Sequence, residues 1–176
     1  MKFHAKRQIL FLLISFLLII PDYVTKQLAV QHLSDGTKIV VLKQVLYLLY
    51  IENRGAAFGV FQGAQYMFYL ITVVVMGGIL YIVNRIPEDK KYRPLYLVSV
   101  LIFAGAIGNF IDRLKQQYVV DFIYFSPIDF PVFNVADIYV TCGCALMIVL
   151  FLFYYKDDDF SFIKNGKQKK TMQEEG

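Results

Sequence analysis

Carboxylates and amides gather in an apolar stretch of the chain between residues 104 and 137. They are Asn109, Asp112, Asp121, Asn134 and Asp137, joined by one arginine, Arg113. A charge at the centre of a bilayer costs roughly 2.5–3.5 kcal/mol, so ionisable residues in apolar membrane segments usually have partners and a function. Two aspartates that are forced together cannot both ionise at low cost, and the pair then holds one proton over a broad pH range. One carboxylate can take a proton from water while the other gives a proton to a peptide carbonyl, which predicts peptide hydrolysis.

The residues that other hydrolytic mechanisms need are missing from the sequence. His4 and His32 are the only histidines, and neither belongs to a His-Glu-x-x-His motif, so a zinc peptidase lacks its ligands. There is no Gly-x-Ser-x-Gly motif, and Ser99 has no evident base. We therefore expect no metal and no cofactor, and we expect the amides of Asn109 and Asn134 to orient the aspartates.

The composition is that of a membrane protein. Of the 176 residues, 57% are hydrophobic, and the mean hydropathy is +0.51, which suits one domain embedded in lipid. The net charge is +4, but the basic residues cluster as they do at the cytoplasmic ends of membrane helices, so nucleic acid is not an expected partner. The spacing of Cys142 and Cys144 fits neither a zinc site nor a redox pair, and we expect both to be buried packing residues.

Four stretches are long and apolar enough to cross a bilayer, which needs about 20 residues in a helix. The expected helices span about residues 8–28, 66–83, 94–113 and 133–155. In the outer loop at about 32–59, a turn signal and many Val, Ile, Leu and Tyr residues predict short strands. The predicted fold is an all-α polytopic membrane protein, residues 1–155, with a small extracytoplasmic β-sheet platform after the first helix. Residues 156–176 are expected to form a disordered cytoplasmic tail.

Polar residues recur at helical spacing on two of these helices. Asp22 and Lys26 are four residues apart and can pair, either as a capping pair that snorkels to the interface or in support of a site. Gly108, Asn109 and Asp112 share one face of the third helix and form a small, polar stripe that must face protein. With a basic N-terminus and four crossings, both termini are expected in the cytoplasm. Every unusual polar residue then lies at the outer end of the helices.

The loop from about residue 114 to residue 132 is too apolar to extend into water. We expect it to lie on the membrane surface and to present Asp121 inward. Phe122 to Phe125 would otherwise expose an apolar patch, so we expect this loop to be mobile and to close over a substrate. The guanidinium of Arg113 can bind any of three partners: a lipid head group, a substrate carbonyl or a neighbouring carboxylate.

Five short motifs follow one another along the chain. They are Asp-x-x-Thr-Lys (22–26), Asn-x-Gly-Ala-Ala-Phe-Gly (53–59), Gly-Asn-x-x-Asp-Arg (108–113), Val-Val-Asp-Phe (119–122) and Phe-Asn-x-Ala-Asp (133–137). Each motif is modest alone, but all five occur in order within four predicted helices. From about residue 9 to residue 155, the sequence resembles bacterial lipoprotein signal peptidase, also called signal peptidase II.

The resemblance implies a membrane-embedded aspartic endopeptidase that removes the signal peptide from prolipoproteins by cutting before the diacylglyceryl-modified cysteine. It implies that Asp121 and Asp137 are the catalytic pair. The matching motifs assign support or substrate binding to Asp22, Lys26, Asn53, Gly108, Asn109, Asp112, Arg113 and Asn134. The resemblance also implies inhibition by globomycin, a sheet that cradles the substrate, and a site near the extracytoplasmic face of the bacterial cytoplasmic membrane. We expect a monomer whose partners are a lipid-modified prolipoprotein and membrane lipid.

Two residues depart from the family pattern. Tyr23 stands where the family often has Gln, and Glu52 stands where it often has Arg, which changes the charge near the substrate entrance. The choice of Asp121 over Asp112 as the partner of Asp137 rests on the resemblance, since Asp112 is next to an arginine and looks more like an ionised structural carboxylate. The residues alone leave two other functions open, which are a small ion-coupled transporter or channel subunit and a structural scaffold.

Overall fold

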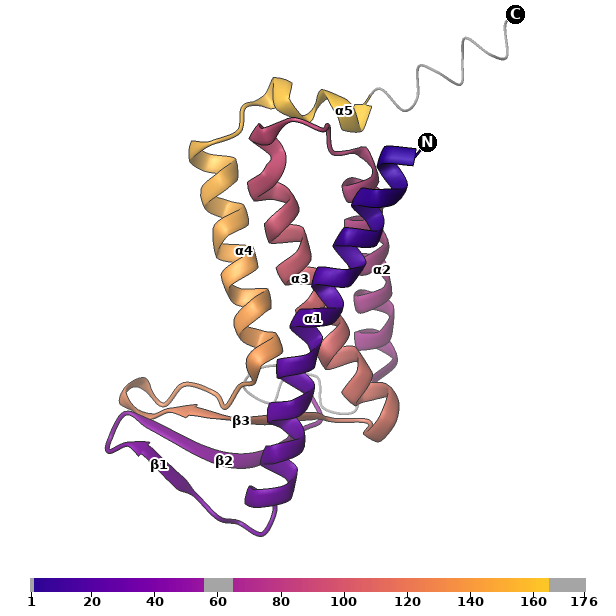
Figure 1. The fold of residues 1–176 in the computed structure, drawn as a ribbon. Helices are drawn as coiled ribbons and strands as arrows, with labels where there is room; N and C mark the ends of the chain where they lie inside the picture. Colours follow the sequence, from indigo (N-terminus) through magenta and orange to yellow (C-terminus); the bar gives the residue numbers. More distant parts are fainter. Residues whose placement is uncertain (1, 56–64, 165–176) are drawn as a thin grey trace, which may run out of the picture.

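Four long helices form an upright bundle in the computed structural model, which describes residues 2–55 and 65–164 (Figure 1). The helices are α1 (Lys2–Leu33), α2 (Gln65–Arg85), α3 (Arg93–Gln116) and α4 (Val135–Phe153). Each contains a stretch that is long and apolar enough to cross a membrane. The chain is therefore a multi-pass membrane protein with four membrane-spanning helices in its described part, as the sequence predicts.

Helix α3 lies within the bundle and packs against each of the other three helices. Its contact with α4 is close because Gly105 has no side chain, and a Cβ there would lie 2.4 Å from the carbonyl oxygen of Ala136. Gly108 allows the same approach to α1, since a Cβ there would lie 2.5 Å from Oδ2 of Asp22. The predicted small stripe of α3 therefore does face protein, and it determines how near the polar ends of α1 and α4 come to each other.

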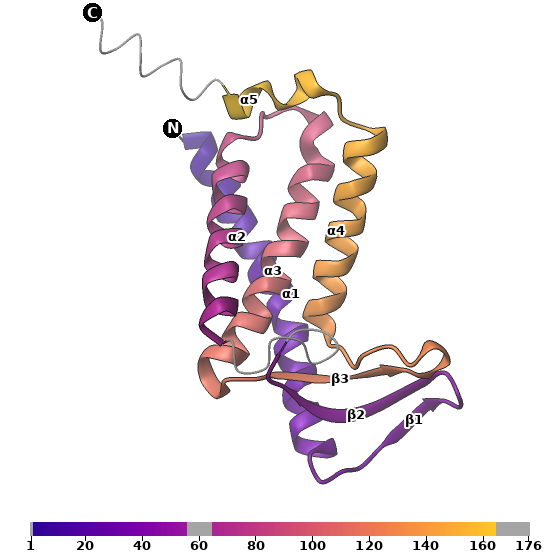
Figure 2. The ribbon, with the colours of Figure 1, turned by 180° about the vertical axis from the view of Figure 1, so that it is seen from behind.

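A three-stranded antiparallel sheet lies across one end of the bundle (Figure 2). Its strands are β1 (Ile39–Leu42), β2 (Leu46–Asn53) and β3 (Val119–Phe125), in the order β1-β2-β3. The register places Asn53 opposite Val119 and Ile51 opposite Asp121. The sheet thus brings the end of β2 beside the aspartate of β3.

Strand β3 corrects the expectation that Asp121 lies in a loop, while the expected mobility of this segment stays a prediction. Val119 to Phe122 are buried, and Phe122 packs with Ala29 and Leu33 of α1, while Ile123 to Phe125 are half-buried. Two backbone amides of β3 also donate hydrogen bonds to the carbonyl oxygen of Phe133. Asp121 is therefore held on a paired strand.

Several element boundaries differ from the predicted ones. Helix α1 continues to Leu33, within the range assigned to the outer loop, because Ala29 and Leu33 pack beneath the sheet. The expectation of a disordered tail from residue 156 is wrong for η4 (Asp157–Phe160) and α5 (Ser161–Lys164), which are helical, while residues 165–176 lie outside the described residues. Two further short helices are η2 (Lys90–Tyr92) and η3 (Ser126–Ile128).

The two cysteines were expected to be buried, and this expectation is wrong. Both Cys142 and Cys144 are exposed and unpaired. The reason is that Gly143, between them, faces α3, where a Cβ would lie 2.6 Å from the side chain of Ile102. The flanking thiols therefore point away from the bundle.

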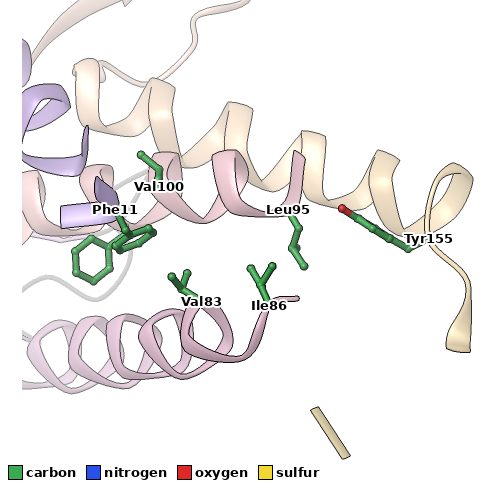
Figure 3. Packing of buried hydrophobic residues seen from close by; sticks show 7 residues of the cluster. Phe11, Val83, Ile86, Leu95, Val100 and Tyr155 are labelled. Carbon is green, nitrogen blue, oxygen red and sulfur yellow. The ribbon is translucent and has the colours of Figure 1, made fainter. Parts of the chain in front are cut away.

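The main hydrophobic core lies at the end of the bundle that is opposite to the sheet. Phe11 of α1, Val83 of α2 and Leu95 of α3 meet there, together with Ile86, which follows α2, and Tyr155, two residues after the end of α4 (Figure 3). Aromatic contacts extend this core, since the ring of Phe11 lies 5.0 Å from that of Phe103. Apolar packing thus fixes one end of the bundle, and polar contacts dominate the other.

Replacing Gly105 by alanine tests the α3–α4 contact. The new methyl group would meet a backbone oxygen that cannot move alone, so we expect the free energy of unfolding to fall by roughly 1–3 kcal/mol. Gly78→Ala is the matched control, because a Cβ at Gly78 meets no atom within 4 Å and alanine favours a helix. Unfolding of both variants in detergent measures the difference, and equal stabilities would contradict the close contact.

Candidate active site

Lys26 is a buried lysine of α1 that lies beside the polar end of α3. Its side chain is 1% exposed, and its Nζ atom lies 2.9 Å from Oδ2 of Asp22 and 3.1 Å from Oδ2 of Asp112. The ammonium also donates a hydrogen bond of 3.0 Å to Oδ1 of Asn109. These three contacts match the three donors of an ammonium group. The pair of Asp22 and Lys26 is therefore internal to the protein, and the alternative of a pair that snorkels to the interface is wrong.

The two carboxylates around Lys26 also hold backbone groups of other elements. Oδ1 of Asp22 accepts a hydrogen bond of 2.8 Å from the amide of Ala136, in the first turn of α4. Oδ2 of Asp112 accepts one of 3.3 Å from the amide of Val120, in β3. Asp112 thus has the contacts of a structural carboxylate, as its sequence context suggests, although its cationic partner is Lys26.

The amide of Asn109 is oriented by the lysine. Because an ammonium can only donate, the atom of Asn109 that faces Lys26 must be the oxygen. The Nδ2 group then points the other way and donates a hydrogen bond of 2.7 Å to Oδ1 of Asp137. The ammonium of Lys26 therefore determines that Asn109 presents its Nδ2 group to Asp137.

Asn134 joins the two candidate catalytic aspartates. It caps α4, and its Oδ1 accepts the amide of Asp137 at 2.9 Å, while Oδ2 of Asp137 accepts the amide of Asn134 at 3.2 Å. With its oxygen occupied in this way, Nδ2 donates to Oδ1 of Asp121 at 2.6 Å and to Oδ1 of Asn109 at 3.1 Å. One buried amide thus contacts both aspartates.

Asn53 repeats this arrangement from the sheet. Its Oδ1 accepts the amide of Gly55 at 3.0 Å, so its Nδ2 is turned to Oδ2 of Asp121, at 2.8 Å. Both oxygens of Asp121 therefore accept a hydrogen bond from an asparagine. Gly55 is the last described residue of the motif at 53–59, and residues 56–59 lie outside the described part of the chain.

Burial controls the protonation of Asp121. Burial of its side chain is the largest cause that raises the pKa of its carboxyl group, the charge of Asp137 is the second, and the pKa that results from all contacts is about 7. The hydrogen bonds from Asn53 and Asn134 and the charge of Lys26 act in the opposite sense and lower the pKa. Near neutral pH, Asp121 is therefore able to carry or release a proton.

Arg113 extends toward the same site but has no acidic partner. It forms no salt bridge with any described residue, so the alternative of a structural ion pair is not supported. Its Nη2 donates to the carbonyl of Gly55 at 3.2 Å, and the guanidinium lies 4.6 Å from the ring centre of Phe68. Its buried Nε has no hydrogen-bond partner among the described residues. Arg113 thus keeps donor capacity for a bound carbonyl or phosphate oxygen.

A cavity of about 760 Å³ opens beside Asp121 and Asp137. Its wall is largely apolar, but it also contains Asn53, Arg113 and Thr141. The apolar part of the wall was not predicted as a site from the sequence, although Thr141 follows Asp137 at the helical spacing of four. The apolar side chains of the wall are those of Ile51, Phe68, Phe130, Pro131, Val132, Phe133 and Ile138. Among the described residues, no three His, Cys, Asp or Glu side chains are grouped as a metal site would require.

Of the two departures from the family pattern, only Glu52 lies at the cavity. Glu52 lines the cavity and pairs with Arg54 at 2.7 Å, and both side chains are exposed. This contact lowers the pKa of the Glu52 carboxyl group. Tyr23 is exposed on α1, where its ring lies 4.9 Å from Nζ of Lys115. Neither residue contacts the candidate catalytic aspartates through a hydrogen bond.

Comparisons with known proteins show which protein family and which sequences this chain resembles. The profile of the Signal peptidase (SPase) II family matches residues 14–153. A lipoprotein signal peptidase of Shouchella clausii is 42% identical over 137 residues, which are 78% of this chain and 89% of that protein. One of Clostridium tetani is 43% identical over 145 residues, 81% of this chain and 90% of that protein.

The fold is also similar to two solved structures, each described as a bacterial membrane enzyme. The one at 2.3 Å resolution has a TM-score of 0.73 and 34% identity, and the comparison covers 81% of this chain and 87% of that chain. The one at 1.9 Å resolution has a TM-score of 0.72 and 34% identity, with coverage of 82% and 94%. The sequence match therefore includes α2, α3, α4 and most of α1, and the structural match covers about four fifths of the chain.

Replacing Lys26 by methionine tests the buried ion cluster. The change leaves Asp22 and Asp112 buried without their cation, so we expect the free energy of unfolding to fall by roughly 3–5 kcal/mol. Lys115→Met is the control, because Lys115 is exposed and its loss should change stability by less than about 0.5 kcal/mol. Denaturant unfolding in mixed micelles compares the variants. A Lys26 variant as stable as the Lys115 variant would contradict the structural role of the cluster.

Proposed function

The chain belongs to the signal peptidase II family, and from that premise we propose that it removes signal peptides from prolipoproteins with Asp121 and Asp137 as its catalytic pair. We place the cleaved bond directly before the diacylglyceryl-modified cysteine. The observation that carries the proposal is the shared contact of Asn134 with both aspartates, next to a cavity large enough for a peptide segment.

The proposed mechanism uses a single proton between two carboxyl groups. The ionised carboxylate takes a proton from water as the water oxygen bonds to the carbonyl carbon of the scissile bond, and the protonated carboxyl gives its proton to the carbonyl oxygen. The tetrahedral intermediate then collapses and the C–N bond breaks. The amine leaves with the proton of the first carboxyl group, and one hydroxyl of the intermediate returns its proton to the second carboxylate as the product acid forms. The raised pKa of Asp121 supports this scheme, because a proton is then available near neutral pH.

The asparagines serve to keep the two carboxyl groups in position. Asn53 and Asn134 hold the oxygens of Asp121, and Asn109 holds Oδ1 of Asp137. Fixed donors of this kind require little rearrangement as charge moves during the reaction. Arg113, with its free donor capacity at the cavity, would bind a carbonyl of the peptide or a phosphate of a lipid.

The shape of the cavity supports substrate entry from the membrane. Its apolar wall continues to Thr141 and Cys142, which lie on the exposed side of α4. A hydrophobic signal peptide can therefore reach the carboxyl groups from the lipid, without passing through water. The positive-inside rule places the basic end of the bundle in the cytoplasm, so we assign both termini to the cytoplasm and the site to the extracytoplasmic face of the bacterial cytoplasmic membrane.

The family relationship favours a peptidase over the ion-coupled transporter that the residues alone left open. The position of the carboxylates agrees with this choice. Asp121 and Asp137 lie at the sheet end of the bundle, and in the described part of α1 to α4 no acidic side chain lies between Asp22 and the basic end. A chain of carboxylates that relays ions through the membrane would need such groups.

Cleavage of a diacylglyceryl-modified prolipoprotein by the purified enzyme tests the proposal. We expect Asp121→Asn and Asp137→Asn each to lower kcat by about 10²–10⁴-fold, because each change removes a proton-transfer group. The control is Asp129→Asn, since Asp129 is exposed in the segment after β3 and accepts its hydrogen bond from Tyr124, outside the site.

Asp112→Asn tests whether Asp121 or Asp112 is the catalytic partner of Asp137. We expect this variant to be less stable, because it weakens the contact with Lys26, and to retain cleavage for the fraction that is folded. Unfolding and cleavage are measured on the same preparations. Full activity in the Asp121 variant, or complete loss in a stable Asp112 variant, would contradict the proposed pair.

A further inference from the structure

A second cavity lies at the opposite end of the bundle from the aspartates. It has a volume of about 450 Å³ and lies between the start of α1 and the segment that joins α2 to α3. Four basic side chains line it, those of Lys6, Arg7, Lys90 and Arg93. We call this cavity the basic cleft.

Among the described residues, no acidic side chain pairs with Lys90 or Arg93 of the basic cleft. Glu88 and Asp89 also line the cleft, and the Asp89 carboxylate accepts a hydrogen bond of 2.8 Å from the amide of Lys91. The side chains of Lys90 and Arg93 are exposed and form no ion pair or hydrogen bond in the described part of the chain. The cleft therefore carries positive charge that is available to an anion.

Arg7 forms the inner wall of the cleft and is held firmly in place. Its Nη1 and Nη2 donate to the carbonyl oxygens of Ile86 and Val83, the latter at 2.8 Å, where α2 ends. Its buried Nε has no hydrogen-bond partner among the described residues. An unpaired buried donor of a charged group is costly, and an anion in the cleft would remove that cost.

The start of α3 adds to the attraction for an anion. This helix of 24 residues begins at Arg93, which lines the cleft. The positive end of its dipole lies there, although the Arg93 amide already donates to the carbonyl oxygen of Lys90 and Pro94 has no amide hydrogen. The helix end acts here together with the basic side chains and the unpaired Nε.

The position of the basic cleft indicates where the anion comes from. The apolar span of α1 begins at Lys6 and α2 ends at Arg85, so the cleft lies where the bundle leaves the hydrocarbon layer. Leu10 of α1 lines the cleft and is exposed, and the exposed Leu13 and Leu17 follow it at spacings of three and four on the same helix face. This apolar face offers contact to an acyl chain, which a free phosphate ion does not have.

We propose that the basic cleft binds the phosphate of an anionic phospholipid, with an acyl chain along the face of α1 that carries Leu10, Leu13 and Leu17. Lys90 and Arg93 contact the head group from the loop side, and Nε of Arg7 faces it from the wall. The bound lipid then links the start of α1 to the segment between α2 and α3. This site is separate from the catalytic cavity, and the inference does not depend on the proposed reaction.

Titration of the full chain in detergent tests the inference. Phosphatidylglycerol or phosphatidylcholine is added, and the bound lipid is counted by native mass spectrometry. We expect phosphatidylglycerol to bind about tenfold more tightly than phosphatidylcholine, and the double variant Lys90→Gln/Arg93→Gln to lose about tenfold in affinity for phosphatidylglycerol. The control Arg85→Gln/Lys156→Gln removes the same charge at the same end of the bundle, outside the cleft, and should change the affinity less than about twofold.

Three results would overturn the inference. An equal loss in the two double variants would show a general attraction of the basic end for anions. Equal affinity for the two lipids would show that the net charge of the head group does not determine binding. Displacement of phosphatidylglycerol by an equal concentration of inorganic phosphate would show a site for the free ion. Because the measurement counts bound lipid, its failure would leave the proposed peptidase activity untouched.

Discussion

The polar end of this protein depends on one buried cation. Lys26 is withdrawn from water between two carboxylates, and removal of charges from water is costly unless every partner is well placed. Here all three donors of the ammonium are used, and its two carboxylates also hold backbone amides of α4 and β3. Such a cluster adds little net stability compared with apolar packing, but it allows only one arrangement of α1, α3, α4 and the sheet.

That arrangement determines the direction of every amide at the candidate site. The lysine fixes Asn109, a backbone amide fixes Asn134, and another fixes Asn53, so all three Nδ2 groups point at Asp121 or Asp137. The aspartates therefore lie in a ring of donors while burial opposes their ionisation. A site that keeps a proton near neutral pH is thus maintained by groups that take no direct part in the proposed reaction.

The sequence predicted the local features of this structure better than the long-range ones. The spacing of Asp22 and Lys26, and the small residues on the third helix, correctly indicated contacts within and between helices. Strand β3 was missed because an apolar run between two loops also fits a segment on the membrane surface, and only pairing with β2 makes it a strand. The contact of Lys26 with Asn109 joins residues 83 apart, a separation that no helical period describes. The sequence correctly predicted that the amides of Asn109 and Asn134 orient the aspartates, but not the partners that turn these amides toward them.

The account rests most directly on the protonation of Asp121 in the folded protein. Infrared spectra of the enzyme in detergent, with carbon-13 in the aspartate carboxyl groups, would follow its carboxyl band against pH, and the Asp121→Asn variant would assign that band. The structure predicts a protonated carboxyl group that disappears with a midpoint at about pH 7. A midpoint near 3.8, the ordinary value for aspartate, would contradict it, because Asp121 would then be ionised throughout the neutral range and could supply no proton.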